Sequence, residues 1–550
     1  MYPRIIFLLL IIYKVNLIFN HKCGTDLLLK NHTFINLDNI KTQKRKLSNE
    51  YTPLKLKVDM SYLKTQKMIG DDIIKSLEKI FDEITNSFSS ILSVRHVEIK
   101  IDDENIIKDG CQIPTFHENV KYWFMEYDIL IFPAITSNID KTILAASSPC
   151  MFINGNTKPI AGIVLINQNL SLDKKDFEYR MKNILFHELT HIIGFHPIIF
   201  ENLKLILTKT INGQQYSYIN SKKVLEKAKL HFGCDNIEGI QLENQGASGT
   251  IGSHWETRYM LGDYMIGSDY SENVISDITL ALLEDTGLYK VNYYSGGLFR
   301  FGKNQGCAFL NKKCLINKGE NTLFPNEFCV NVGEAFCGGS HIAKGDCYIV
   351  RYNSIPEKYR YFEEKEKGGM ASADYCPVSF MFEADKEYFY PKNCRYGKEE
   401  FSSIGEIIGE NSMCFESSLL NSDTESICYK MECDKQNKKI NVYINDAEVI
   451  CPGYETILNN PNGLRGKLKC PDYNLVCTSD TWCNEMFECI DKKSTANSNS
   501  YEYISNPESL HERDKANLLV DDNNIFESFG EKIIVNVKKL FLLFMLYINF

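Results

Sequence analysis

The sequence has no excess of positive charge and no closely spaced cysteine pairs, and each absence excludes a class of protein. The formal net charge is -10 at pH 7, whereas a protein that binds nucleic acid usually carries a basic face. None of the 19 cysteines stands in a C-x-x-C pair, the spacing typical of cysteine-ligated zinc sites. We therefore expect no nucleic-acid partner, and we interpret the cysteines as disulfides formed in an oxidising compartment.

The two ends of the chain predict passage through the secretory pathway. Arg4 and the apolar run Ile5–Ile12 have the form of a signal peptide, which is too short for a comfortable membrane span. No small-x-small cleavage site is obvious after this run, so an uncleaved anchor is the alternative. The hydrophobic tail Ile533–Phe550 is interrupted by Lys538 and Lys539, and we expect it to attach the protein to a membrane as a span or as a lipid-anchor signal. The predicted location is the cell surface or the extracellular space.

Residues 187–191 read H-E-L-T-H, a spacing that suits a zinc hydrolase. On a helix, His187 and His191 are four residues apart and point from the same face, so both can bind one metal ion. Glu188 lies beside them, placed to take a proton from a metal-bound water. Apolar residues before and between these positions predict that the helix is buried.

A catalytic zinc needs a third protein ligand and an open position for water. In the short metzincin form of the motif, the third histidine comes three residues after the glycine. In this chain that position is Pro197, and His196 is one residue out of register, so we expect its side chain to point away from the pair. Four further histidines lack supporting context or are expected on a helix face: His117, His231, His341 and His511.

His254 is the better candidate for the third ligand. It lies in Gly-Ser-His-Trp-Glu, residues 252–256, at the end of a loop rich in glycine. Eleven residues later comes Met265, whose neighbours predict a tight turn. A methionine turn beneath the metal is the second mark of metzincins.

These motifs, in this order, resemble the leishmanolysin-like surface metallopeptidases, which are metzincins with a long insertion before the third histidine. The resemblance extends from about residue 50 to about residue 490 through further short motifs: Phe232–Asp235, Glu243–Gly246, Asp285–Tyr289, Gly306–Leu310 and Asp374–Pro377. It implies one zinc ion per chain bound by three ligands, His187, His191 and His254. It further implies that Glu188 is the general base and that Met265 shapes the floor of the site without binding the metal.

The resemblance also gives roles to several cysteines. It implies that Cys23, in His-Lys-Cys, is a pro-segment thiolate that occupies the open zinc position and silences the zymogen, as thiolate is a strong zinc ligand. The alternative is that Cys23 is paired or simply unused. The resemblance further implies two disulfides, Cys111 with Cys150 and Cys234 with Cys307, and leaves the other pairings open. The short pro-segment, the additional Cys483 and Cys489, and the neighbours of Met265 depart from the family.

The predicted fold class is α+β, with a metzincin-type catalytic domain, a central domain that supplies the third histidine, and a disulfide-rich C-terminal domain of β and irregular structure. Helices are expected at Ile69–Leu92, Val224–His231 and Val274–Leu288, and strands at residues 54–59, His96–Ile101, Tyr127–Ala134 and Ala161–Ile166. The predicted divisions are a signal peptide (1–20), a short pro-segment (21–49), the N-terminal catalytic domain (50–204), the central domain (205–310), the cysteine-rich domain (311–490), and a linker with the hydrophobic tail (491–550).

The sequence therefore predicts a zinc-dependent endopeptidase, secreted or at the cell surface, that acts on proteins or peptides and has a role in cell adhesion. Ala161–Ile166 is a candidate for the edge strand that pairs with an extended substrate, and an ordinary core strand is the alternative. A non-catalytic surface adhesin on a peptidase scaffold is the competing function. A purely structural zinc site is disfavoured, because such sites are usually closed by four protein ligands.

Overall fold

The computed structural model describes residues 34–39, 45–137, 139, 143–168, 177–245, 250–268, 272–332, 335–339, 341–380, 393–395, 399–420, 423–477, 486–487 and 490. All of them belong to one compact unit, Met1–Lys492. The predicted signal peptide, Cys23, the linker and the hydrophobic tail lie outside these residues. Within the described part, no helix has both the length and the apolar character needed to cross a membrane.

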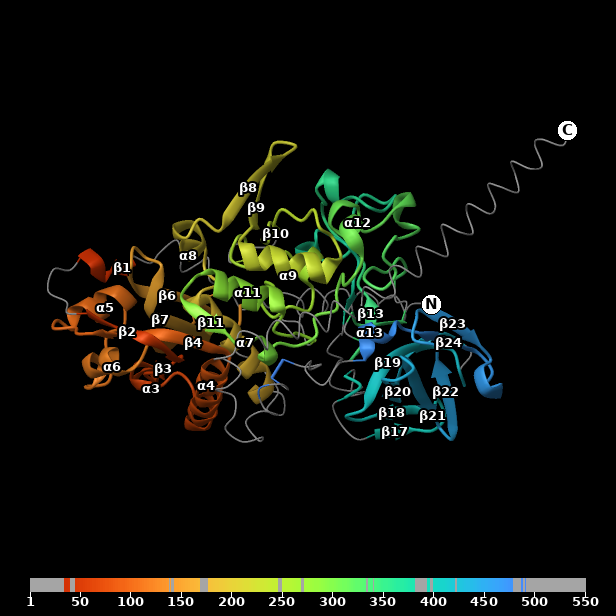
Figure 1. Ribbon diagram of the computed structural model, residues 1–550, viewed down its shortest axis with the longest axis horizontal. Coiled ribbons are helices and arrows are strands. Elements are labelled where there is room, and N and C mark those ends of the chain that lie inside the picture. Colours follow the sequence, from red (N-terminus) through yellow and green to blue (C-terminus); the bar gives the residue numbers. More distant parts are fainter. Residues whose placement is uncertain are drawn as a thin grey trace, which may run out of the picture. The chain divides into compact units, whose positions relative to one another are not determined.

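A five-stranded sheet forms the centre of the part that carries the H-E-x-x-H motif (Figure 1). Three parallel strands make up one side of it, and β6 runs antiparallel to β7 while β1 runs parallel to β6. The strand order is β1 (Ile35–Asn36), β6 (Ala145–Ile153), β7 (Lys158–Asn167), β5 (Ile129–Thr136) and β3 (Leu56–Val58).

Ala161–Ile166 is a strand, as predicted, but its interpretation as the edge strand for a substrate is wrong. It lies in β7, which pairs with β5 on one side and with β6 on the other. The strand on the outer side of β7 is β6, and within the described residues the far side of β6 pairs only at Met151 and Phe152, with β1. The sequence did not reveal β6 because all nine of its residues are buried, and a strand buried on both faces shows no apolar–polar alternation.

Two long helices pack against each other beside this sheet, α4 (Asp71–Ile91) and α7 (Phe177–Ile193). The helix predicted at Ile69–Leu92 is thus confirmed, and its buried residues recur with the helical period along one face: Leu77, Ile80, Phe81, Ile84, Phe88 and Ile91. Phe88 stacks on Phe186 of α7, with ring centroids 4.2 Å apart. Phe487, from the end of the cysteine-rich part, meets the same Phe186 ring edge-on at 5.2 Å.

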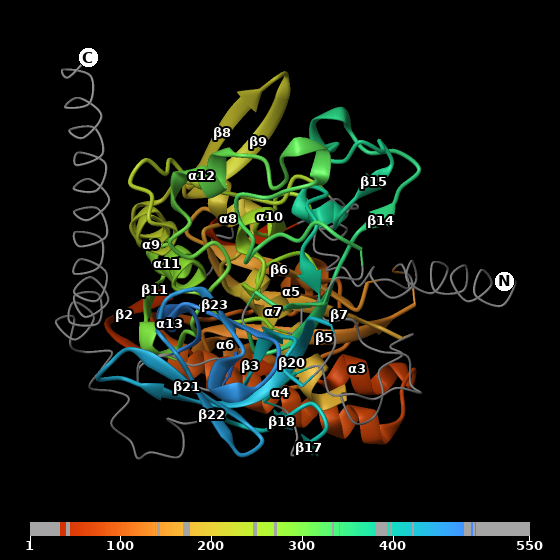
Figure 2. The ribbon, with the colours of Figure 1, turned by 90° about the vertical axis from the view of Figure 1, so that its right-hand side faces the viewer.

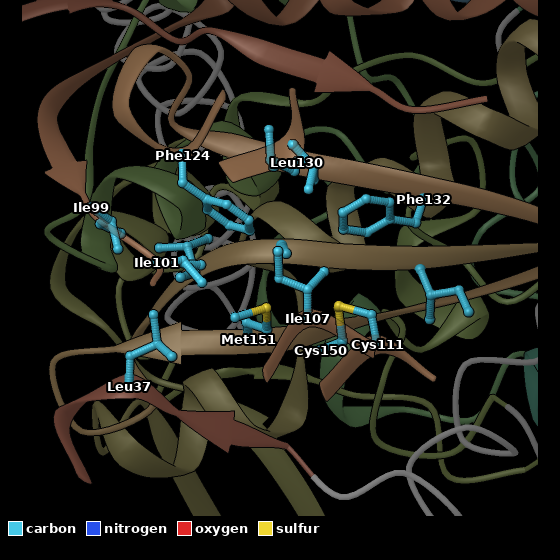
Figure 3. Close-up of a cluster of buried hydrophobic side chains, with 14 of the residues drawn as sticks. Leu37, Ile99, Ile101, Ile107, Cys111, Phe124, Leu130, Phe132, Cys150 and Met151 are labelled. Carbon is cyan, nitrogen blue, oxygen red and sulfur yellow. A yellow bond between two sulfur atoms is a disulfide. The ribbon is translucent and has the colours of Figure 1, made fainter. Parts of the chain in front are cut away.

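A hydrophobic cluster lies around the Cys111–Cys150 disulfide (Figure 3). The disulfide joins α5 (Asn105–Cys111) to β6, which confirms the pairing implied by the family resemblance. Phe124 of α6 (Val120–Glu126) packs into this cluster, as does Leu37, which follows β1 and is fully buried. The segment around β1 is therefore built into this core.

The remaining elements of this part form two smaller sheets and several short helices. One sheet contains β2 (Arg45–Pro53), β4 (Leu92–Ile99) and β11 (Tyr289–Val291), and the other contains the hairpin β8 (Ile206–Ile211) and β9 (Gln214–Ile219) with β10 (Ile240–Gln241). Figure 1 shows this hairpin in yellow. The helices are α3 (Ser61–Gln66), α8 (Pro197–Asn202), α9 (Lys222–Phe232), α10 (Thr257–Met260), α11 (Asp277–Asp285) and α12 (Gly306–Asn311). The helices predicted at Val224–His231 and Val274–Leu288 correspond to α9 and to the shorter α11. The disulfide Cys234–Cys307 is also confirmed.

The cysteine-rich part is built on an antiparallel six-stranded sheet, shown in cyan and blue in Figure 2. Its strand order is β22 (Ala447–Cys451), β21 (Lys439–Ile444), β20 (Glu425–Asp434), β19 (Ser412–Ser417), β24 (Lys467–Cys470) and β23 (Thr456–Asn459). Shorter strands precede it: β12 (Ala335–Cys337), β13 (Lys344–Cys347), β14 (Val350–Arg351), β15 (Lys367–Gly368), β16 (Ser379–Phe380), β17 (Glu399–Phe401) and β18 (Glu406–Ile408), and the helix α13 (Tyr473–Val476) follows it. Six disulfides join its segments: 314–376, 329–347, 337–414, 394–428, 433–477 and 451–470. The prediction of disulfides in place of metal ligands is confirmed for these cysteines.

Candidate metal centre

The structure brings His187, His191 and His254 together. The first two lie one turn apart on α7, and the third comes from the loop before α10. Their Nε2 atoms are 3.0 Å apart for His187 and His191, 3.1 Å for His187 and His254, and 3.2 Å for His191 and His254. Among the described residues, they form the one group of three histidine, cysteine or acidic side chains close enough together to bind a metal ion.

The opposite ring nitrogen of each histidine faces a backbone carbonyl oxygen. The Nδ1 atoms lie 2.7 Å from the Tyr264 carbonyl for His187, 2.8 Å from the Phe195 carbonyl for His191, and 3.1 Å from the Thr250 carbonyl for His254. A carbonyl oxygen only accepts hydrogen bonds, so each Nδ1 must donate its hydrogen and each Nε2 must present a lone pair. These carbonyls therefore fix both the tautomer and the orientation of the rings.

Three converging lone pairs repel one another unless a cation lies between them. Burial, followed by the charges of the neighbouring histidines, holds the pKa of His191 well below its usual value. Burial and the charge of His187 do the same for the pKa of His254. Three histidine rings that converge through their Nε2 atoms are a ligand set of catalytic zinc. The residues present fit a zinc ion.

Glu188 lies on α7 next to His187 and is almost completely buried. Its backbone carbonyl accepts a hydrogen bond of 2.7 Å from the hydroxyl of Ser147 on β6. This bond joins the motif helix to β6 of the five-stranded sheet.

Met265 is fully buried in a tight turn next to the third ligand's loop. Its carbonyl accepts a hydrogen bond from the backbone N–H of Trp255 at 3.0 Å, and its own N–H donates to Asp263 Oδ1 at 2.7 Å. The carbonyl that orients His187 belongs to Tyr264, in the same turn. The turn predicted around Met265 is thus present, and it contacts both parts of the chain that supply ligands.

The loop that carries His254 is fastened by buried carboxylates. The backbone N–H of Glu243 donates to the His254 carbonyl at 2.9 Å. Glu256 Oε2 accepts a hydrogen bond of 2.8 Å from the Asn244 side chain. Burial raises the pKa of both Glu243 and Glu256 well above the usual value. These contacts connect Glu243 and Asn244 to the loop of the third histidine.

The other described histidines lie outside the cluster. His196 is fully buried, its Nε2 lies 3.3 Å from the Ser148 hydroxyl, and burial lowers its pKa to about 3. His231 on α9 bonds the Phe301 carbonyl at 2.9 Å, and His341 lies 3.3 Å from the Cys414 carbonyl. His117 stacks on Trp123. The predicted zinc ligand Cys23 and the remaining His511 lie outside the described residues.

Two polar residues that support this site, Asp263 and Thr279, were not predicted from the sequence. Asp263 Oδ2 accepts a 2.7 Å hydrogen bond from the Thr279 hydroxyl. That hydroxyl in turn accepts a 2.8 Å bond from Trp255 Nε1. Burial raises the pKa of Asp263 to about 6, although its hydrogen bonds act in the opposite direction. An available signal was the aspartate two residues before Met265, because aspartate often bonds the backbone N–H two residues on.

Comparison with known proteins gives one consistent result. The chain matches the family model described as leishmanolysin over residues 75–483. It is 28% identical over 358 residues to a leishmanolysin homolog of Crithidia fasciculata, covering 62% of this chain and 53% of that protein. It is 24% identical over 411 residues to leishmanolysin of Leishmania major, covering 70% and 65% of the two chains. With a leishmanolysin-like peptidase of Caenorhabditis elegans it shares 35% identity over 222 residues, 35% of this chain and 33% of the relative. The chain thus spans between about half and two thirds of the length of the first two relatives.

Proposed function

Because the chain belongs to the leishmanolysin family, a family of metallopeptidases, we propose that it is a zinc-dependent endopeptidase that hydrolyses peptide bonds in proteins. One observation carries the proposal. Three histidine Nε2 atoms lie within 3.2 Å of one another, next to the buried Glu188. Among the described residues no fourth side chain joins this group, whereas a structural zinc site usually has four protein ligands.

Each residue of the proposed site has its own role in the reaction. A bound zinc ion would supply Lewis-acid polarisation of the scissile carbonyl and a water of lowered pKa. Glu188 would be the general base, which accepts a proton from the attacking water and gives it to the leaving amine. His187, His191 and His254 are the three ligands, and Met265 shapes the floor beneath them.

We place an extended substrate along β6. A peptide adds to a sheet through the backbone hydrogen bonds of an outer strand. Within the described residues, Ala145–Pro149 pairs only with β7, and it includes Ser147, whose hydroxyl bonds the Glu188 carbonyl. A substrate on this stretch would lie beside the general base.

The proposal extends to zymogen control and location. Cys23 is proposed as the thiolate that silences the zymogen. Phe34 follows it by eleven residues, and the Phe34 ring lies edge-on to His196 beside β6. Eight disulfides support folding in the secretory pathway and a cell-surface or extracellular location. Membrane attachment through the hydrophobic tail and a role in cell adhesion belong to the same proposal.

The experiment that tests the function is Glu188→Gln in the full chain after removal of the pro-segment. Cleavage of a casein-type substrate should fall at least about a hundredfold, since a general base contributes that much or more, while about one zinc ion per chain remains bound. The matched control is Glu178→Gln on the same helix, whose exposed carboxylate pairs only with Lys79 at 2.7 Å among the described ion pairs. Unchanged cleavage by Glu188→Gln would refute the mechanism. Full zinc content in a wild-type protein without turnover would favour the adhesin.

A further inference from the structure

We propose that Asp263 and Thr279 are positioning residues, which together hold the third metal ligand in register with the H-E-x-x-H helix. The inference rests on the proposed metal site, but not on the substrate or on turnover. His254 comes 63 residues after His191 and lies in a loop, so contacts other than helix geometry must set its position against α7.

No cross-link supplies that position directly. The Cys234–Cys307 disulfide encloses the whole segment, but its two ends are 73 residues apart. A loop of that length leaves the middle free to move by many ångströms unless packing and hydrogen bonds hold it. The hydrogen bonds around Asp263 are among the buried polar contacts that hold this loop near its ligand.

The hydrogen bonds from Trp255 to Thr279 and from Thr279 to Asp263 can run in one direction only. The Trp255 Nε1–H can only donate, and the ionised Asp263 carboxylate can only accept. The Thr279 hydroxyl stands between them, accepting at 2.8 Å and donating at 2.7 Å. Trp255, Thr279 and Asp263 are each completely buried, so water cannot replace a lost partner and each bond matters more than it would at the surface.

These hydrogen bonds act on His254 through Trp255, the next residue in the sequence. Trp255 follows His254 directly, its ring is fixed by the bond to Thr279, and its backbone N–H donates to the Met265 carbonyl at 3.0 Å. The same ring lies edge-on to Phe195, at the end of the motif, with centroids 5.0 Å apart. A displacement of Trp255 would therefore move the third ligand relative to α7.

The hydrogen bonds of Asp263 also act on His187, through the turn that contains Tyr264 and Met265. Asp263 Oδ1 accepts from the Met265 N–H at 2.7 Å, which closes the turn around Tyr264. The Tyr264 carbonyl accepts from His187 Nδ1 at 2.7 Å. One carboxylate thus holds the turn that orients His187 and, through Thr279, the tryptophan beside His254.

Helix α11 supplies the rigid support for this arrangement. Thr279 lies in its first turn, and the Ser276 side chain caps the helix by accepting from the Thr279 N–H at 3.1 Å. The Ser276 N–H donates to Asp263 Oδ2 at 3.3 Å. Groups that orient metal ligands from behind typically change metal affinity about 10- to 100-fold when they are mutated.

The test measures zinc affinity in the full-length protein by competition with a chelator, without any substrate. Thr279→Val keeps the shape of the side chain but removes both hydrogen bonds, and we expect zinc affinity to fall about 10- to 100-fold. Thr279→Ser retains the hydroxyl and should stay within about threefold of the wild type. Asp263→Asn should weaken zinc binding as Thr279→Val does, and it keeps the test decisive if the valine variant does not fold.

The matched control is Thr286→Val at the C-cap of the same helix. Thr286 is also buried, and its hydroxyl donates to the Leu283 carbonyl at 2.6 Å, away from the turn. If Thr279 had only a general structural role, both valine variants would lower the unfolding midpoint of the metal-free protein without a difference in zinc affinity. Zinc affinity of Thr279→Val and Asp263→Asn within threefold of the wild type, or an equal loss in Thr286→Val, would overturn the proposal. Because no turnover is measured, failure of the peptidase proposal would leave this result standing.

Discussion

The part of the chain up to residue 310 and the cysteine-rich part after it are stabilised by different means. The first part has two disulfides and a core of long apolar side chains from α4, α7 and the five-stranded sheet. The second part has six disulfides, and one of its buried clusters consists of Ile408 with four cysteines: Cys337, Cys394, Cys414 and Cys428. Both parts also have an apolar core, and that of the six-stranded sheet includes Phe415, Tyr429 and Val442, so the two parts differ chiefly in how many covalent cross-links are added to it.

The largest expected effect comes from removing one disulfide from each part. The Cys394–Cys428 and Cys111–Cys150 bridges close loops of similar size, 34 and 39 residues. Either double alanine variant should lose about 4 kcal/mol of stability from loop entropy alone. The variant of Cys394 and Cys428 should lose more, because the buried cluster around its missing bridge contains only Ile408 and the Cys337–Cys414 disulfide among the described residues.

Urea unfolding and limited proteolysis of the two variants measure this difference. The variant of Cys111 and Cys150 should remain folded, because apolar side chains surround the missing bridge. Equal losses of stability in the two variants would contradict the contrast between the two parts.

A smaller effect should appear in acid within the cysteine-rich part. Burial lowers the pKa of His341 to about 4, whereas an unfolded histidine titrates near 6.5. Below pH 6.5 the unfolded chain binds a proton that the folded chain does not, so stability should fall by about 2 kcal/mol between pH 6.5 and 4. His341→Gln should remove this share of the acid dependence, measured as the urea midpoint at pH 7 and at pH 4.5.

The smallest effect has the opposite sign and lies in the first part. His96 on β4 bonds Asp128 at 2.8 Å, and this hydrogen bond raises the pKa of His96. A raised pKa adds stability that is fully present below pH 6.5 and is lost as the pH rises through the folded-state value. His96→Gln should therefore cost less than about 1 kcal/mol at pH 5.5, since the ring is partly exposed, and almost nothing at pH 9. A loss that grows with pH in urea unfolding would contradict this assignment.

The meeting of the three histidines could be predicted because each part of the motif has a local sequence pattern. His187 and His191 lie one helical turn apart, and His254 is followed at a short distance by Met265. The apolar period of α4 is also local, and that helix is confirmed. Two of the eight disulfides could be named from the family resemblance, and the other pairings depend on contacts between distant strands.

The features that the sequence does not reveal depend on distant partners. The position of β7 inside the sheet is set by β6, whose buried residues show no alternation. The bond between Asp263 and Thr279 joins residues 16 apart, and no pattern in the intervening sequence points to it. Both features became visible only from the arrangement of the folded chain.

The contact between Phe186 and Phe487 has a consequence for the order in which the protein is made. The two rings lie 5.2 Å apart, yet about 300 residues separate them in the chain, and Phe487 is almost fully buried. Translation proceeds from the N-terminus, so Phe186 and the adjacent His187 emerge long before their final neighbour has been synthesised. The helix that carries two of the three histidines completes its packing only when nearly the whole chain has left the ribosome.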